Sequence, residues 1–431
     1  MNELDFDTPR FTIKKPAVRY DAQGGAPDAE RAQRAIASFM RDMTRSAATY
    51  MESCIRCGHC AEACHFYVTS EDPQFTPIWK LEPFRKAYRK KKVTAQELRG
   101  WQELLYDSCT MCGRCTLACP MGIDIAGLVA QARRGMFAAG LVPHELHAVA
   151  ERAEREGSPL GATPKVLKER IEWLSDEHGV EIVLDRPQAD IMVTLSSIEI
   201  MKYPASIVAL AKILARMGAS WTLRSEGYEA TNFGLFSGNL DWQRDMSLRV
   251  IEAALACRAK TVLLPECGHA YGAMRWQGAN MYGKPLPFRV LHITEFLAEA
   301  LRERRLELTP MAGSLTFHDP CQVSRRGGAT GAPREILASL KADLREMAPG
   351  GDASWCCGGG GGVVTMHRAD AHRHRAFEIK MKQVEATGAE RLATSCSNCR
   401  LTFDDGQAHF QWDRKMESLL ELVAEHLAAP G

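Results

Sequence analysis

The hydrophobic pattern of the chain changes near residue 190. Before that point, apolar residues recur at helical spacing, as over residues 30–52, which predicts a lead-in helix, and over the charged segment 141–185. After it, short apolar runs alternate with longer amphipathic segments. Strands and helices in alternation predict an α/β fold with a largely parallel sheet.

Five apolar runs in the second part are predicted to be strands, with helices between them. The strands are expected at 191–195, 220–223, 261–264, 314–317 and 391–394. The helices are expected at 204–217, 244–257, 293–305, 333–344 and 369–385.

A weak internal repeat relates two segments of this alternating part. The stretches 191–204, 231–238 and 261–270 correspond to 314–324, 354–361 and 391–399. From Ile198 to Asn232 is 34 positions, and from Cys321 to Cys356 is 35. The predicted organisation is an extension over 1–44, a helical domain over 45–140, a helical connector over 141–185 and two α/β modules over 186–310 and 311–431.

Length and composition narrow the functional classes. The 431 residues carry a formal net charge of +1, so nothing draws the chain as a whole to nucleic acid or to a membrane surface. It has no run of 18 apolar residues, and its N-terminus is polar rather than signal-like. The expected location is the cytoplasm, and attachment to the inner membrane through a partner subunit stays open.

Cysteine is the most informative residue type. Of the 15 cysteines, 13 lie in tight clusters. In a cytosolic chain such clusters are typical of metal ligands, because thiols there stay reduced. An odd count in a long chain argues against an extracellular disulfide scaffold.

Two cysteine runs have the spacing C-x2-C-x2-C-x3-C. They are Cys54, Cys57, Cys60 and Cys64, then Cys109, Cys112, Cys115 and Cys119, which Pro120 follows. In this pattern three thiolates wrap one 4Fe–4S cubane, and the fourth reaches the other cluster. We therefore predict that Cys54, Cys57, Cys60 and Cys119 hold one cubane, and that Cys109, Cys112, Cys115 and Cys64 hold the other. Zinc knuckles are the alternative, but a zinc site typically takes its four ligands from two Cys-x2-Cys pairs that lie well apart. Two complete four-cysteine runs in tandem fit the two-cluster pattern better.

The segment between the two runs is about 44 residues long and helical in pattern, which favours an all-helical dicluster domain. It includes the basic stretch 80–92. That stretch is either a docking face for an acidic partner or a solvated helix face.

A second cysteine set follows the predicted strands of the last module. Its members are Cys321, Cys356, Cys357, Cys396 and Cys399. Loops after parallel strands share one edge of a sheet, so these five thiols are expected to converge. The glycine run 358–362 matches no nucleotide-binding fingerprint. We interpret it as a steric adaptation to adjacent cysteines, which leaves space for a substrate.

The last module resembles the CCG cysteine-rich module of heterodisulfide reductases in three motifs, which are His318-Asp-Pro-Cys321, Cys356-Cys357-Gly358 and Cys396-x-x-Cys399. From about 50 to 425 the chain is similar to D-subunit-like members of that family and to K-subunit-like proteins of sulfite reductase complexes. The resemblance implies a helical dicluster ferredoxin domain followed by two Rossmann-like CCG modules. It also implies that the five cysteines hold a non-cubane 4Fe–4S centre, at which a disulfide is cleaved or formed.

The first module departs from the family pattern. It has Asn232-Phe233 in place of the cysteine pair, and Cys267-Gly-His269 in place of the last motif. One non-cubane cluster is therefore expected, not two. Cys267 and His269 are candidates for binding substrate or donating a proton, or they are ordinary loop residues.

His318 and Cys257 also lie in the alternating part of the chain. His318 is a candidate proton donor beside the proposed centre, or it shapes its loop by a hydrogen bond. Cys257, in a helical segment, is expected to be core.

The predicted function is an iron–sulfur oxidoreductase subunit that acts on a disulfide, persulfide or related sulfur compound. No dinucleotide fingerprint is present, so two-electron chemistry is expected from a flavoprotein or a quinone-linked membrane subunit as partner. Two alternatives stay open. One is an electron-transfer subunit of a flavin-dependent hydroxy-acid dehydrogenase of the glycolate or glycerol 3-phosphate type, and the other is a scaffold with structural metals.

Overall fold

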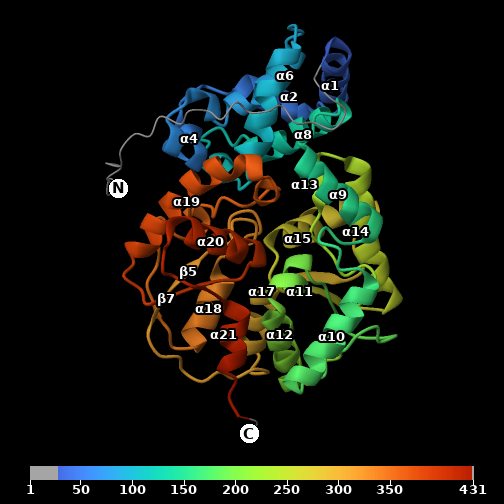
Figure 1. Cartoon of the computed structure of the whole chain (residues 1–431), viewed down its shortest axis with the longest axis vertical. Helices are drawn as coiled ribbons and strands as arrows, with labels where there is room; N and C mark the ends of the chain where they lie inside the picture. Colours follow the sequence, from blue (N-terminus) through green and yellow to red (C-terminus); the bar gives the residue numbers. More distant parts are fainter. Residues whose placement is uncertain (1–27, 430–431) are drawn as a thin grey trace.

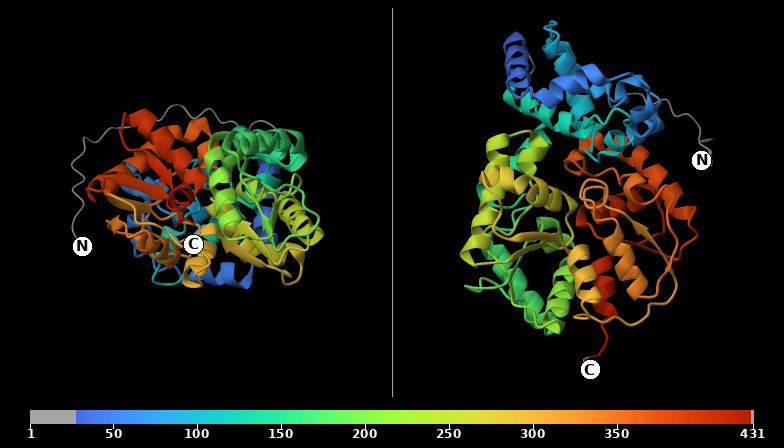
Figure 2. Two further views of the ribbon diagram at one scale, coloured as in Figure 1. Left: turned by 90° about the horizontal axis from the view of Figure 1, so that it is seen from below. Right: turned by 180° about the vertical axis from the view of Figure 1, so that it is seen from behind.

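The computed structural model describes residues 28–429, so positions 1–27 of the expected extension lie outside the described residues. Figure 1 shows a helical part, coloured blue to teal, that lies across two α/β units standing side by side. The view from behind in Figure 2 shows the same arrangement, with one unit green to yellow and the other orange to red. Within 28–429 there is no helix of the length and apolarity that a bilayer crossing requires.

The helical part holds α1 to α8 and three short turns. Their bounds are α1 (Ala29–Arg41), α2 (Arg45–Ser53), α3 (His59–Glu62), α4 (His65–Ser70), the 3-10 helices η1 (Pro73–Phe75) and η2 (Trp79–Leu81), α5 (Glu82–Tyr88), α6 (Ala95–Gln102), the π-helix η3 (Glu103–Asp107), α7 (Arg114–Leu117) and α8 (Ile125–Ala138). The expected single helix over 30–52 is wrong, because Asp42 ends α1 and Thr44 caps α2 by accepting the Ala47 N–H.

The connector is helical, as expected, with α9 (His144–Glu156) and α10 (Pro164–His178). Helix α9 packs against α13 and α14 of the first α/β unit. The segment is therefore part of that unit's surface and not a free linker. Its status as a separate domain stays a prediction.

The first α/β unit is built on four parallel strands in the order β2-β1-β3-β4. The strands are β1 (Ile191–Val193), β2 (Trp221–Leu223), β3 (Thr261–Leu264) and β4 (Arg289–His292). Its helices are α11 (Ser197–Lys202), α12 (Pro204–Arg216), α13 (Phe233–Ser237), α14 (Leu240–Ala256), α15 (Gly268–Gly272), the π-helix η4 (Ala273–Gln277), α16 (Gly278–Tyr282) and α17 (Ile293–Arg302).

The second unit repeats this order as β6-β5-β7-β8, again all parallel. Its strands are β5 (Ser314–His318), β6 (Asp343–Leu344), β7 (Arg391–Thr394) and β8 (Met416–Ser418). Its helices are α18 (Gly331–Ser339), the 3-10 helices η5 (Gly351–Ala353), η6 (Val363–Thr365) and η7 (His367–Ala369), α19 (Asp370–Glu385), α20 (Ser397–Phe410) and α21 (Leu419–Glu425). The equal strand order agrees with the internal repeat.

The α/β expectation is confirmed as two four-stranded parallel sheets, with differences at the sheet edges. All five predicted strands are present, but β4, β6 and β8 were not predicted. All three lie at a sheet edge, where the continuous apolar run of a strand that is buried on both faces is less complete. The predicted helix 333–344 is wrong at its end, because α18 stops at Ser339 and Lys341 turns left-handed with φ 52° before β6 begins.

The two α/β units share one hydrophobic core. Leu210 of α12 and Leu420 of α21 belong to the same buried cluster, as do Leu263 of β3 and Leu315 of β5. Helices α12 and α21 are in direct contact. Because this core spans both units, their strand ends are held in a constant relation to each other.

Candidate functional site

Two neighbouring strands of the second sheet lead into cysteine-bearing loops. Strand β5 ends three residues before Cys321, and β7 ends two residues before Cys396. The loops after such strands meet at one sheet edge. One small cavity, here called the C-terminal cavity, is lined by Cys321, Cys356, Cys357, Cys396 and Cys399. The sulfurs of Cys357 and Cys399 are 3.5 Å apart, and those of Cys321 and Cys356 are 3.9 Å apart.

The glycine run 358–362 packs tightly against its surroundings. A Cβ atom on Gly359 would lie 1.9 Å from Oγ1 of Thr402. Gly361 has φ +62°, and a Cβ there would lie 3.0 Å from the Thr110 carbonyl oxygen. Larger residues are excluded at both positions. Glycine is therefore required here by close packing against Thr402 and Thr110, while an adaptation to the adjacent cysteines stays a prediction. The expected open space for a substrate is wrong here, because neighbouring chain fills it.

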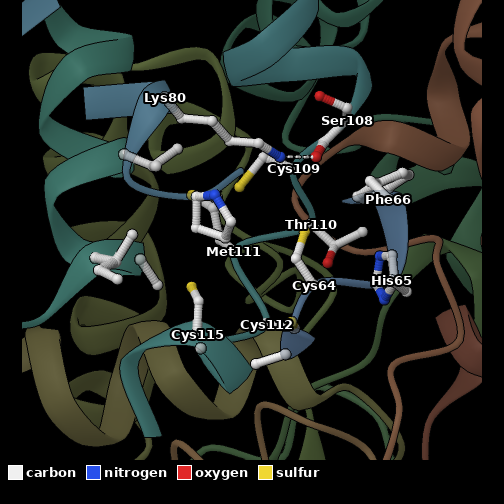
Figure 3. A pocket seen from close by; sticks show the side chains of 16 residues that line it. Cys64, His65, Phe66, Lys80, Ser108, Cys109, Thr110, Met111, Cys112 and Cys115 are labelled. Carbon is white, nitrogen blue, oxygen red and sulfur yellow. Dashed lines mark hydrogen bonds between the residues drawn. The ribbon is translucent and has the colours of Figure 1, made fainter. Parts of the chain in front are cut away.

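The eight N-terminal cysteines line two further cavities. The middle cavity contains Cys64, Cys109, Cys112 and Cys115, which Figure 3 shows around one space. The outer cavity contains Cys54, Cys57, Cys60 and Cys119. In each cavity the fourth cysteine comes from the other run. The structure thus brings together the two sets that the spacing grouped, and their roles as ligands stay a prediction.

Both cysteine runs fold in the same local way. The residue before the second cysteine is left-handed in each, with φ 57° at Arg56 and 52° at Met111. The glycine after it is left-handed too, with φ 87° at Gly58 and 78° at Gly113. Such angles are uncommon for residues with a side chain. They curl each run so that its thiols line a common space.

The donor set fits iron–sulfur clusters. Burial raises the pKa of Cys60 and of Cys64, and it raises the pKa of Cys115 well above the ordinary value. Four thiolates in one closed space would also repel one another. Metal ions remove both penalties by binding the thiolates directly. The structure therefore provides four sulfurs at each ferredoxin-type cavity and five at the C-terminal cavity.

The three cavities follow one another through shared walls. Ile125 lines both the outer and the middle cavity. Cys112 of the middle cavity packs with the five C-terminal cysteines, and its hydrogen bond with Cys356 raises its pKa well above the ordinary value. The Cys356 sulfur also lies 3.6 Å from Oγ1 of Thr110. At the other end Cys57 is exposed, so the outer cavity reaches the surface.

One buried arginine joins all three parts of the molecule. Arg133 of α8 is fully buried and donates from Nε to the Leu105 carbonyl at 2.9 Å and from Nη2 to the Cys109 carbonyl at 2.8 Å. Its Nη1 donates to the carbonyls of Phe236 at 2.9 Å and Gly361 at 2.6 Å. The fork geometry of a guanidinium allows these simultaneous bonds. Arg133 thereby holds the middle cavity against loops of both α/β units.

His318 lies beside the C-terminal cavity. A ring nitrogen and the sulfurs of Cys357 and Cys399 lie within 4.8 Å of one another. Among the described residues neither ring nitrogen has a hydrogen-bond partner, so a loop-shaping hydrogen bond is not present there. Burial lowers the pKa of His318 well below its ordinary value. The imidazole is therefore neutral near pH 7, and its role in proton delivery stays a prediction.

The first α/β unit contributes to the same cavity through its loop after β3. His269 lines the C-terminal cavity, and its Nε2 accepts the Gly361 N–H at 3.2 Å. Burial lowers the pKa of His269 to about 4. The Cys267 sulfur lies 3.3 Å from Oγ1 of Thr231, and burial followed by the nearby Cys396 raises its pKa. Both candidates are therefore near the five cysteines.

In the first unit, Asn232 and Phe233 stand where the second unit has its cysteine pair, and both side chains contact neighbouring residues. Asn232 caps α13 by accepting the Leu235 N–H, and its amide donates to the Gln243 carbonyl at 2.8 Å. Phe233 packs edge-on against Phe236, which in turn packs edge-on against His269. Aromatic side chains thus occupy the region where an intact module would place its cysteine pair.

Sequence reasoning missed several side chains of the site. Gln322 donates to the Met111 carbonyl at 3.0 Å, and Arg325 donates to the Cys112 carbonyl at 3.0 Å. Both tie the loop after β5 to the second cysteine run. Their only sequence signal is closeness to Cys321. Lys380 is buried in the second unit, and burial lowers its pKa to about 8.

The basic stretch 80–92 is partly structural. Lys80 is buried and donates to the Ser108 carbonyl, as Figure 3 shows, and Lys86 pairs with Glu97. Arg85 is buried and pairs with Glu82 at 3.3 Å. The exposed charges are therefore confined to residues 89–92.

Comparison with known proteins gives two domain matches. Residues 50–123 match the 4Fe-4S dicluster domain, and residues 315–404 match the cysteine-rich domain, CCG. The first contains all eight N-terminal cysteines, and the second contains all five of the C-terminal cavity. The dicluster domain accounts for two 4Fe–4S clusters, and the cysteine-rich domain supports a further, non-cubane 4Fe–4S cluster.

Whole-chain relatives agree with these matches. The chain is 26% identical over 395 residues to the D-subunit of dihydromethanophenazine:CoB–CoM heterodisulfide reductase from Methanosarcina barkeri, covering 88% of this chain and 94% of that protein. It is 24% identical to Hdr-like menaquinol oxidoreductase iron–sulfur subunit 2 of Archaeoglobus fulgidus, covering 90% and 81%. It is 25% identical to EtfAB:quinone oxidoreductase of Syntrophomonas wolfei, covering 83% and 55%.

Proposed function

We propose that this chain, a homologue of the heterodisulfide reductase D-subunit and of Hdr-like iron–sulfur subunits, is an oxidoreductase subunit that acts on a disulfide or related sulfur compound. The observation that carries the proposal is the row of three cysteine-lined cavities, which leads from the surface at Cys57 to a buried set of five thiols. A ferredoxin alone would need no third cavity. A row that ends at a larger donor set suits electron delivery to a reaction site.

The proposed ligand sets follow the cavities. Cys54, Cys57, Cys60 and Cys119 hold the outer cubane, and Cys64, Cys109, Cys112 and Cys115 hold the middle one. Cys321, Cys356, Cys357, Cys396 and Cys399 hold the non-cubane centre. When bound, the clusters supply one-electron transfer and, at the last site, iron that binds sulfur.

The overall reaction is the reversible cleavage R–S–S–R′ + 2 e⁻ + 2 H⁺ → R–SH + R′–SH. The protein's own contribution is to keep water out of the C-terminal cavity and to orient polar groups toward it. His318 and His269 lie at the cavity as neutral imidazoles. A neutral imidazole offers one N–H donor and one acceptor. We propose that these two rings bind and orient the substrate sulfur.

The domain assignment forms part of the proposal. Residues 45–140 form the dicluster domain, 186–310 a degenerate CCG module and 311–431 the intact one, with 141–185 as connector. The electron partner is a flavoprotein or a quinone-linked membrane subunit that approaches the exposed side of the outer cavity. The chain itself would then stand on the cytoplasmic side of such a complex.

The first test is a metal and sulfide count on anaerobically purified full-length protein. Three four-iron centres require about 12 irons per chain. The oxidised protein should also show an EPR signal that changes when a thiol is added. Zinc without iron, or a third-centre signal that ignores every thiol, would refute the proposal.

A further inference from the structure

A fourth cavity, here called the junction cavity, lies where the helical part meets both α/β units. Its volume is about 310 Å³, at the lower end of the range typical for small-molecule sites. Helix α8 lines one side with Gln131 and Arg134. The segment from α15 to α16 lines another side with Trp276, and the loop after β5 contributes Gln322 and Arg326.

The junction cavity adjoins the C-terminal cavity through two shared side chains. His269 and Gln322 line both spaces. Gln322 donates a hydrogen bond from its side-chain amide to the Met111 carbonyl, which fixes its position. A Cβ atom added at Gly268 would lie 3.2 Å from the Gln322 Cβ, and one added at Gly272 would lie 3.6 Å from the Gln322 Oε1. The wall between the two cavities is therefore one side chain thick.

The charges around the junction cavity favour an anion. Arg134 and Arg326 both line it, and Asp124 is its only carboxylate among the described lining residues. Asp124 is already engaged, since it caps α8 at the Gly127 N–H and lies 3.5 Å from Nη1 of Arg326. His269 adds no charge near pH 7, because burial lowers its pKa to about 4. The cavity therefore has an excess of one positive charge.

Two polar groups of α8 lack partners within the described chain. Arg134 has no hydrogen bond or ion pair to any residue of 28–429. The Oε1 atom of Gln131 is buried and has no partner there. Buried polar atoms are normally satisfied, so the Gln131 oxygen points to a missing ligand or water, whereas Arg134 is half-buried and available to one. Both groups belong to the lining of the junction cavity.

We propose that the junction cavity binds the anionic end of a small sulfur substrate, while its sulfur reaches past His269 and Gln322 to the five cysteines. This inference rests on the proposed function and adds the substrate class, namely a small thiol or disulfide that carries a carboxylate or similar anion. Arg134 pairs with the anion, and Arg326 assists it from the opposite wall. Guanidinium groups bind such anions through paired, charge-assisted hydrogen bonds.

The test compares two probe thiols on the anaerobically purified full chain with its clusters. The probes are 3-mercaptopropionate and the neutral 3-mercapto-1-propanol, each titrated while the EPR signal of the third centre is recorded. The anionic thiol should act at a concentration lower by roughly tenfold or more. In Arg134→Gln and in Arg326→Gln the anionic thiol should lose this advantage, so that the ratio of the two titration concentrations falls toward one. Arg244→Gln, on the exposed side of α14, is the matched control.

A competition experiment needs no variant. Excess propionate, which has the anion but no thiol, should shift the 3-mercaptopropionate titration of the unaltered protein to higher concentration and leave the neutral thiol unaffected. Equal responses to both thiols, or no effect of propionate, would refute the junction cavity as the anion site and leave the proposed function intact. A signal that responds to neither thiol would refute the proposed function, and this inference with it.

Discussion

Glu199 gives the most quantitative prediction, because its environment disfavours a charge. Its Oε2 accepts the N–H of Ser196 at 2.7 Å and the hydroxyl of Ser196 at 2.8 Å, while Oε1 is buried without a partner in the described chain. Burial, and next the nearby Glu266, raise the pKa of Glu199 to about 8. The folded protein therefore keeps a proton near pH 7 that the unfolded chain releases.

The direction and size of the effect follow from linkage. The unfolded chain has a pKa of 4.5 at this carboxyl. The contribution of Glu199 to the free energy of unfolding is therefore fully present below pH 4.5 and declines as pH rises toward 8. At pH 7 the interval is 7.0 − 4.5 = 2.5 pH units, or about 3 kcal/mol at about 1.4 kcal/mol per unit. Glu199→Gln removes the titration and keeps an oxygen that accepts both Ser196 bonds. The variant should therefore be more stable than the parent by about 2–3 kcal/mol at pH 7.

The assay is thermal unfolding of both proteins under anaerobic conditions from pH 5 to pH 9. A gain of about 3 kcal/mol corresponds to about 6–12 °C in a unit of 150–250 residues. The difference should shrink to about 2–3 °C at pH 5, which lies only half a unit above the unfolded pKa of 4.5, so that about 0.8 kcal/mol of the difference remains. Glu252→Gln, at an exposed position of α14, is the matched control and should not change the pH profile. Parallel curves for Glu199→Gln and parent across the whole range would refute the reasoning.

Other predictions concern the residues that join the parts. Arg133→Met should destabilise the protein by about 3–5 kcal/mol, because four buried carbonyls lose a charged donor; a thermal midpoint equal to the parent's would contradict this. Cys112→Ser should lower the iron content by up to about four per chain, whereas Cys257→Ser, whose thiol is buried in a separate apolar cluster, should keep the parent's iron. If both variants retained full iron, the ligand set proposed for the middle cavity would be wrong.

Local sequence was sufficient to predict how the N-terminal cysteines group and where most of the strands lie. The spacing C-x2-C-x2-C-x3-C places three thiols on one curl of backbone, and the left-handed residues Arg56 and Met111 produce that curl within each run. The apolar runs that became β1, β3, β5 and β7 lie at the centre of the two sheets, where burial on both faces makes the hydrophobic signal strongest. Edge strands such as β6, with two residues, carry no such signal.

Tertiary structure alone decided which residues surround the site. Arg133 and Gly361 are 228 positions apart, and Gln322 and Met111 are 211 apart. Such contacts depend on how the shared core of the two α/β units holds their strand ends beneath the helical part, and no local period in the sequence encodes that packing. The sequence by itself therefore determined that thirteen thiols form three sets. Their succession in a row, the approach of His269 from the degenerate unit and the junction cavity beside them arise only when the three parts pack together.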